Sequence, residues 1–145
     1  MSIWTQVEGT VTLQNLNREE IIKRLGTPFD YDYIHENGFP KDNPIPSGSE
    51  GSLNYKISKD CTKIFISGSI RSSMCYESIL DWVLRLSELD EDGFDKNISF
   101  ARMQLTIGEP LNIFIYQGFL TNGEYWEHYR KIPQKVYEKI PKEWF

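Results

Sequence analysis

The clearest structural signal in the chain lies at residues 53–71, LNYKISKDCTKIFISGSIR. Apolar and polar residues alternate on both sides of Ser58-Lys59-Asp60, a segment with the composition of a turn. A period of two places successive side chains on opposite faces of a strand. The stretch therefore predicts a β-hairpin whose second strand covers Thr62–Arg71. The residues expected on its inward face are Leu53, Tyr55, Ile57, Ile64, Ile66, Gly68 and Ile70.

A strand and a short helix are predicted before this hairpin. Residues 3–13 also alternate, which is typical of a half-buried strand. Gly9 in the middle of that strand indicates either a bulge or a close neighbour. Asn17 suits the N-cap of the helix, Glu20 completes a capping box, and Gly26 is placed to end it. The inward residues of the strand are Val7, Gly9, Val11 and Leu13.

A second helix and two more strands are predicted after the hairpin. The helix begins near Ser72 or Ser73 and extends to about Leu89, because apolar residues recur there at helical spacing. Residues 98–107 and 111–117 then alternate as strands, joined at Gly108-Glu109-Pro110. We expect the remaining tail, residues 119–145, to form short helical turns that pack on the core.

The element order is thus β-α-β-β-α-β-β, followed by the tail. This order predicts an α+β fold of the ferredoxin-like (split βαβ) type. We expect a two-layer sandwich in which an antiparallel sheet, extended by an extra C-terminal strand, carries two helices on one face. The 145 residues correspond to a single domain, with 1–118 as the core sandwich and 119–145 as the packed tail.

Composition narrows the range of functions. The chain has 16 Lys and Arg against 21 Asp and Glu, a net charge of −5, which disfavours direct nucleic-acid binding. Cys61 and Cys75 form no metal-binding pattern with each other or with a histidine. No basic segment with an apolar run opens the chain, and no apolar run approaches the length of a membrane span. We expect a cytoplasmic protein with reduced thiols, no membrane contact and no cofactor or metal.

The most specific local pattern in the chain is Gly48-Ser49-Glu50-Gly51-Ser52-Leu53 followed by Tyr55. This segment resembles one in a group of small, mostly uncharacterised proteins of tailed phages and prophages. Trp4, Val7 and Gly9 in the first strand, Ser67-Gly68-Ser69-Ile70-Arg71 at the end of the third, and Trp82 also match, so the resemblance covers roughly residues 4–90. That third strand tends to end in Leu-Arg-Asp in the group, whereas Ile70-Arg71-Ser72 stands here. The resemblance implies an accessory protein in the infected cell's cytoplasm, a pool that includes many counter-defence factors.

The long segment 27–50 is the first candidate binding surface. It is rich in Pro, Gly, Asp and Tyr, and a loop this long inside a compact domain is usually functional or mobile. Aromatic residues beside acids suit a protein partner. The predicted contacts with a bacterial host protein are Phe29, Asp30, Tyr31, Asp32, Tyr33, Phe39 and Glu50.

The second candidate is an anion site at residues 47–52. Successive backbone N–H groups in a glycine-rich turn can form an anion-binding nest, and Arg71 would assist at the end of the third strand. The predicted ligands are Ser47, Gly48, Ser49, Gly51, Ser52 and Arg71. Two other interpretations need no anion: the glycines only supply turn conformations, or Arg71 forms an ion pair with Glu50.

An enzyme ranks third among the possible functions. A Cys/His pair is formally available from Cys75 with His35 or His128, but no motif supports it. Phe65 and Tyr116 are expected on the exposed sheet face, where some modules of this fold class stack RNA bases, yet the corresponding RNA-binding pattern is missing. We therefore predict a non-catalytic phage accessory protein that binds and inhibits a host protein as a counter-defence (anti-CRISPR-like or similar) factor, with a small-anion or nucleotide-sequestering protein as the alternative.

Overall fold

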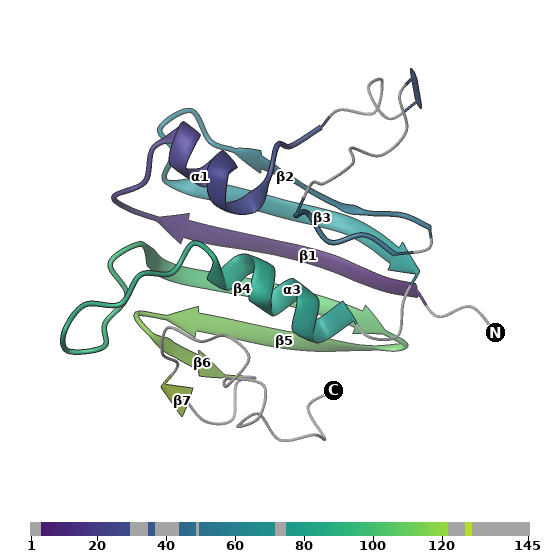
Figure 1. The fold of residues 1–145 in the computed structure, drawn as a ribbon. Coiled ribbons are helices and arrows are strands. Elements are labelled where there is room, and N and C mark those ends of the chain that lie inside the picture. The colour runs from purple at the N-terminus through teal and green to yellow at the C-terminus, as the bar shows by residue number, and fades with distance from the viewer. Residues whose placement is uncertain are drawn as a thin grey trace.

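The structure is a computed structural model that describes residues 4–29, 35–36, 44–48, 50–71, 75–121 and 127–128. These residues form one antiparallel sheet together with the helices labelled α1 and α3 in Figure 1. In chain order the elements are β1 (Trp4–Leu13), α1 (Arg18–Leu25), β2 (Leu53–Ile57), β3 (Lys63–Arg71), α3 (Cys75–Leu84), β4 (Ile98–Ile107), β5 (Glu109–Tyr116), β6 (Phe119–Thr121) and β7 (Glu127–His128).

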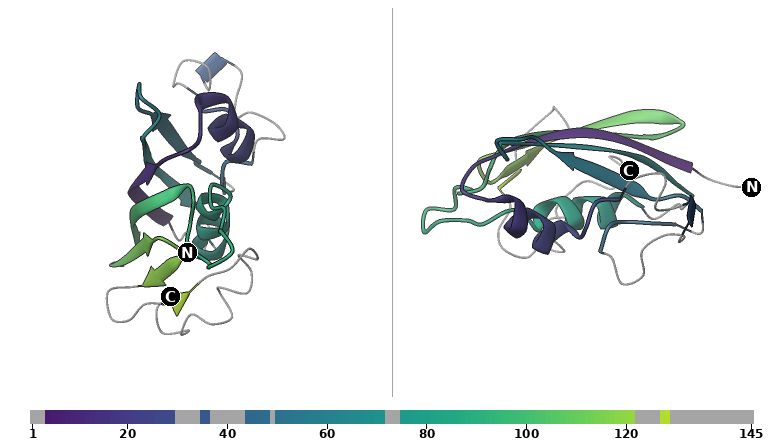
Figure 2. Two further views of the ribbon diagram at one scale, coloured as in Figure 1. Left: turned by 90° about the vertical axis from the view of Figure 1, so that its left-hand side faces the viewer. Right: turned by 90° about the horizontal axis from the view of Figure 1, so that it is seen from above.

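The sheet has seven strands in the order β2-β3-β1-β4-β5-β6-β7. Every strand pairs antiparallel with its neighbour. Figure 2 shows this layer on edge, curved over its length. The predicted α+β class with an antiparallel sheet is confirmed, and the sheet continues beyond the predicted fifth strand through β6 and β7.

The predicted hairpin forms from β2 and β3. Its register runs from Leu53 opposite Gly68 to Ile57 opposite Ile64. The inward face is buried or half-buried along both strands, as the alternation predicted. It belongs to one hydrophobic core with residues from β1 and β4, namely Val7, Val11, Leu13, Ala101, Met103 and Leu105.

Gly9 lies in β1 directly opposite Met103 of β4. An added Cβ at Gly9 would lie 2.2 Å from the Met103 sulfur and 2.9 Å from the Arg102 carbonyl oxygen. Of the two possibilities raised by the sequence, the close neighbour is therefore the correct one. The glycine makes room in the core for the fully buried Met103 side chain.

Helix α1 begins and ends as the sequence predicts. The Glu20 N–H donates to Asn17 Oδ1 at 2.8 Å, and the Asn17 N–H donates to Glu20 Oε1 at 3.2 Å, which completes the capping box. Gly26 follows the last turn with a φ of 95°. Because glycine adopts positive φ without a steric penalty, it can end the helix here.

Side-chain donors from other elements satisfy carbonyl groups at the C-terminal end of α1. Trp82 of α3 donates from Nε1 to the Leu25 carbonyl at 2.8 Å, and the Tyr55 hydroxyl donates to the Gly26 carbonyl. The last four carbonyls of a helix lack partners within the helix, so these contacts replace hydrogen bonds to water. Burial raises the pKa of Tyr55, which keeps its hydroxyl protonated as a donor.

Helix α3 is shorter than predicted, because it ends at Leu84 rather than near Leu89. The next three N–H groups bond to carbonyls three residues back, which tightens the last turn and ends the helix. The Asp95 carboxylate then accepts from the Ser87 hydroxyl at 2.7 Å and holds residues 87–98 in an irregular loop. The predicted start of the helix at Ser72 or Ser73 lies outside the described residues.

The C-terminal strands differ from the expected tail. Strand β5 begins at Glu109, so only Gly108 separates it from β4. Gln117 and Gly118 have φ values of 44° and 94°, and a two-residue turn with two positive φ angles reverses a strand into a hairpin. The helical turns predicted for the tail are therefore wrong at 119–121 and 127–128, which are strands, while 122–126 and 129–145 lie outside the described residues.

The turn between β2 and β3 is organised by Asp60. Hydrogen bonds from the Thr62 hydroxyl, the Ser58 hydroxyl and the Thr62 N–H lower the pKa of Asp60 to about 2. A depressed carboxyl pKa stabilises the fold above the unfolded pKa of about 4. This contribution is lost as the pH falls from about 4 toward 2.

We expect Asp60→Asn to reduce the acid sensitivity of the free energy of unfolding between about pH 5 and pH 2. Urea unfolding at several pH values measures the free energy of unfolding of the variant and of the wild type. The difference between the two should shrink as the pH falls. Thr62→Val keeps the shape of the side chain but removes the hydroxyl donor, so it should raise the pKa of Asp60 in an NMR titration. An Asp60 carboxyl that titrates at its ordinary value in the wild type would contradict this account.

Candidate functional site: the outer face of the sheet

We use the term outer face for the side of the sheet opposite the buried side chains of β1 to β5. Its residues alternate along each strand with the core residues. They are Trp4, Gln6, Glu8, Thr10 and Thr12 on β1; Asn54 and Lys56 on β2; Lys63, Phe65, Ser67 and Ser69 on β3; Phe100, Arg102, Gln104 and Thr106 on β4; and Pro110, Asn112, Phe114 and Tyr116 on β5.

Large aromatic side chains are exposed on the outer face. Phe65 is 48% exposed, Phe100 41% and Tyr116 49%. The predicted exposure of Phe65 and Tyr116 is thus confirmed. Phe100 packs beside Phe114, with ring centroids 6.4 Å apart and ring planes tilted by 39°. These rings come from β3, β4 and β5, so the face presents aromatic surface across most of its width.

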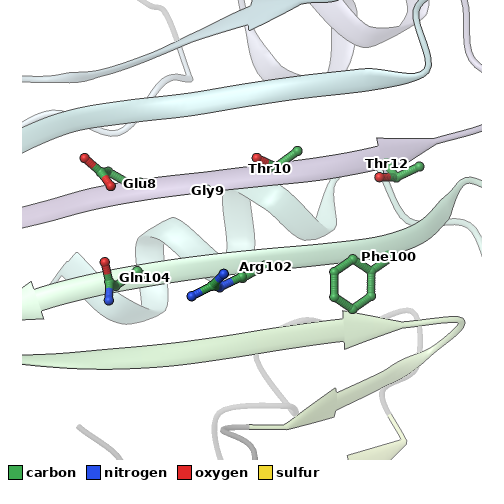
Figure 3. Close-up of a pocket in the computed structure, with 7 residues that line it drawn as sticks. All are labelled: Glu8, Gly9, Thr10, Thr12, Phe100, Arg102 and Gln104. Atoms are coloured by element: carbon green, nitrogen blue, oxygen red, sulfur yellow. The ribbon is translucent and has the colours of Figure 1, made fainter.

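A groove of about 370 Å³ lies on this face between β1 and β4. Figure 3 looks onto it, with the side chains of the two strands in facing rows. Glu8 stands opposite Gln104, Thr10 opposite Arg102, and Thr12 opposite Phe100. The threonines are short and the β4 side chains are long, which leaves a depression over β1.

One line of outer-face residues crosses four neighbouring strands in register. Lys56 of β2 is opposite Phe65 of β3, Phe65 is opposite Thr10 of β1, and Thr10 is opposite Arg102 of β4. We call these four residues the cationic row. Lys63 lies beside it, opposite Thr12. Within the described part of the chain, no carboxylate forms an ion pair with Lys56, Lys63 or Arg102.

The structure places only part of the predicted protein-binding loop. Phe29 is half-buried and packs against the core. Its N–H donates to Asn54 Oδ1 at 3.2 Å, and its carbonyl accepts from the Asn54 amide, so this residue is held against the edge strand β2. Asp30, Tyr31, Asp32, Tyr33 and Phe39 lie outside the described residues.

Arg71 and Glu50 contact each other at the end of β3. Arg71 Nη1 lies 3.2 Å from Glu50 Oε1, and the Arg71 N–H donates to the Glu50 carbonyl at 3.0 Å. The sequence left open whether Arg71 would serve an anion or pair with Glu50, and the structure shows the pair. Both side chains are partly exposed, so this ion pair contributes little to stability.

The segment around the predicted anion ligands folds against the end of β3. The Gly48 N–H donates to the Gly51 carbonyl at 3.2 Å, and the Ser52 hydroxyl donates to the Leu53 carbonyl at 2.8 Å. Ser47 and Ser52 form an isolated bridge, while Ser49 lies outside the described residues. The Gly48 N–H and the Ser52 hydroxyl thus bond within this part of the chain.

Of the residues in the third-ranked Cys/His pair, His35 is exposed, and the side chains of Cys75 and His128 lie outside the described part of the structure. Cys61 is a free, half-buried thiol in the β2–β3 connection. Among the described residues, no three His, Cys, Asp or Glu side chains gather as metal ligands. The clearly shifted pKa values of Asp60 and Tyr55 arise from a turn and from the core.

Comparison of the chain with protein-family models, curated proteins and solved structures finds no match. No helix in the described part of the chain is both long and apolar enough to cross a membrane.

Sequence reasoning identified two of the exposed aromatic residues but missed Phe100, Arg102 and the groove. The signal was available in β4, where every residue between the inward positions must face outward. What the sequence did not determine was the register of β1 against β4, which brings Thr10 beside Arg102.

Proposed function

We propose that this protein is a non-catalytic accessory protein that binds and inhibits a bacterial host protein, using the outer face as its contact surface. The inhibition would be steric, because a bound sheet face covers whatever surface of the partner it occupies. The resemblance to tailed-phage proteins supports an infected bacterial cytoplasm as the setting and a counter-defence role as the process.

The observation that carries this proposal is the exposure of Phe65, Phe100 and Tyr116 on one face. Burying the exposed half of one such ring against a partner is worth about 2 kcal/mol. Aromatic residues are enriched at the centres of protein interfaces, where a few of them carry most of the binding energy. The threonine, serine, glutamine and asparagine side chains around the rings supply hydrogen-bonding groups for a polar rim.

We also infer the finer fold, a split βαβ sandwich with α1 and α3 on the core side. The order β2-β3-β1-β4 with antiparallel pairing supports it. Buried residues of both helices also belong to a single core cluster with the sheet, including Ile21, Leu25, Ile79, Leu80 and Val83. Such a sandwich leaves the other side of the sheet without helical cover, in keeping with the exposed aromatic residues.

The predicted contacts of the 27–50 segment receive less support than the outer face. Phe29 is half-buried against the core and Glu50 is paired with Arg71. The alternative function, sequestration of an anion or nucleotide at residues 47–52, is likewise less favoured because its arginine has a carboxylate partner. Undiminished nucleotide binding after Arg71→Ala would argue further against that alternative.

We expect the double substitution Phe65→Ala/Phe100→Ala to weaken partner binding about tenfold or more. Both rings lie outside the core, so the double variant should lose some stability with the Phe100–Phe114 contact but still unfold cooperatively in urea. The measurement is affinity capture from bacterial lysate with mass spectrometry, followed by titration of the captured protein.

Phe94→Ala is the matched control, because Phe94 is 48% exposed like Phe65 but lies in the loop before β4. This variant should retain the captured protein at wild-type affinity. Equal capture by the double variant and by the control would remove the outer face from the proposal.

A further inference from the structure

The outer face carries positive charge in a chain that is negative overall. Lys56, Lys63 and Arg102 project from three different strands toward the same side, and all three side chains are exposed. Among the described residues of the outer face the one acid is Glu8, which lies opposite Ser67 and Gln104, one row away from Thr10 and Arg102. The net charge of the whole chain is −5, so this face is locally opposite in sign to the protein.

These three cations differ from others that the fold neutralises. Arg24 and Lys96 both lie within 4 Å of the Glu88 carboxylate, and Arg71 pairs with Glu50. In the described residues no such partner serves Lys56, Lys63 or Arg102. Their charges are therefore available to an external carboxylate, and charge complementarity is a main determinant of which partner binds a surface.

From this arrangement we infer that the outer face recognises an acidic, extended segment of its protein partner, laid across the strands along the cationic row. The inference rests on the proposed function and specifies the chemistry of the partner. Carboxylates would meet Lys56 at one end and Arg102 at the other, and an apolar side chain between them would rest on Phe65 and Thr10. Arg102 suits a carboxylate because the planar guanidinium group of arginine binds a carboxylate through two hydrogen bonds.

The dimensions of the row define a sequence pattern for that segment. Neighbouring strands are about 4.8 Å apart, so Lys56 and Arg102, three strands apart, are separated by about 14 Å. An extended segment rises about 3.3 Å per residue and presents alternate side chains to the same side. Residues i, i+2 and i+4 therefore span about 13 Å, which matches acid, apolar and acid at those positions.

A protein segment fits this face better than a nucleic acid. Nucleic-acid binding draws its affinity from many phosphate contacts, whereas the described residues of the outer face offer three cations, Lys56, Lys63 and Arg102. A long polyanion would also meet the negative field of the surrounding chain. A short acidic segment of a folded partner can pair its carboxylates with the cations of the row without extending over the negatively charged remainder of the protein.

The test is an NMR titration of the full chain with a synthetic peptide, Gly-Glu-Ser-Leu-Ser-Glu-Gly with blocked ends. The comparison peptide carries Gln in place of both Glu residues. We expect the acidic peptide to shift the amide signals of the cationic row, and the Gln peptide to bind about tenfold more weakly or more. Raising the salt concentration should weaken the acidic peptide alone.

Variants of the protein sharpen the result. Arg102→Glu should weaken the acidic peptide about tenfold or more, since it places a like charge where the carboxylate binds. Lys59→Glu is the matched control, because Lys59 is exposed in the turn between β2 and β3 and is not an outer-face strand residue. This control should bind the peptide as the wild type does.

Three outcomes would overturn the inference: equal binding of the two peptides, peptide-induced shifts away from the cationic row, or tighter binding of a deoxythymidine oligonucleotide at the same residues. The lysate capture with Phe65→Ala/Phe100→Ala separates this failure from that of the proposed function. If the double variant loses its protein partner while the acidic peptide does not bind the row, only the acidic recognition is wrong. If the double variant keeps its partner, the outer face itself is not the contact surface.

Discussion

Replacement of Trp82 by alanine is expected to lower the free energy of unfolding by about 3–5 kcal/mol, because large-to-small changes in a core remove apolar contacts and leave a cavity. Trp82 is 2% exposed and is among the largest buried side chains of the protein. Its ring also packs edge-on against Tyr55, with centroids 5.8 Å apart and planes at 64°.

The Trp82 effect has a polar component that a second variant separates. Trp82→Phe keeps most of the packing but removes the Nε1 donor, which leaves the Leu25 carbonyl without this partner. An unsatisfied buried group costs about 1–3 kcal/mol. Trp4→Ala is the control, because Trp4 is 41% exposed and should contribute less than the buried ring. Urea unfolding followed by circular dichroism measures all three variants, and a loss at Trp82 no larger than that at Trp4 would contradict the core assignment.

Gly51→Ala is expected to lower the free energy of unfolding by about 2–4 kcal/mol, combining backbone strain with a collision. Gly51 has a φ of +77°, and an added Cβ would lie 2.2 Å from the Ser69 carbonyl oxygen. Because that atom belongs to the backbone of β3, it cannot move aside as a flexible side chain would. The segment around Gly51 packs this closely against the strand that also carries Phe65.

Gly108→Ala provides a matched control for the conformational part of this effect. Gly108 has a φ of +75°, almost the same as Gly51, but nothing lies within 4 Å of the position of its Cβ. Its substitution should cost only the strain of a left-handed residue, about 1–2 kcal/mol. The difference between the urea midpoints of Gly51→Ala and Gly108→Ala then measures the cost of the collision with the Ser69 carbonyl oxygen. Equal destabilisation by both substitutions would show that the segment around Gly51 moves to accommodate the added methyl group, and would contradict this prediction.

Local signals in the sequence predicted the elements with the clearest patterns. The capping box of Asn17 and Glu20 and the alternation of residues 53–71 each rest on neighbours within a few positions along the chain, and both were confirmed. The end of α3 was misplaced because Leu86 and Leu89 continue the apolar spacing of a helix, whereas in the structure they join the core from the irregular loop that Asp95 holds. The strand at 119–121 was missed because the turn signal at Gln117 and Gly118 was not recognised.

The candidate sites show the same division. Composition pointed to the 27–50 segment and to the glycines of 47–52, yet the described contacts place Phe29 against the core and Arg71 on Glu50. Phe65 and Tyr116 were found from alternation alone, which assigns a residue to a face. Alternation does not say which residues of other strands share that face as neighbours.

The identity of each strand and the direction of its side chains followed from the amino-acid pattern, because both depend on a local period of two. The alignment of Lys56, Phe65, Thr10 and Arg102 followed only from the folded sheet. Lys56 and Phe65 share one hairpin, but Thr10 and Arg102 come from strands far from that hairpin in the chain. Their register is set by which hydrophobic faces are buried together in one core, a long-range free-energy balance that no local window contains.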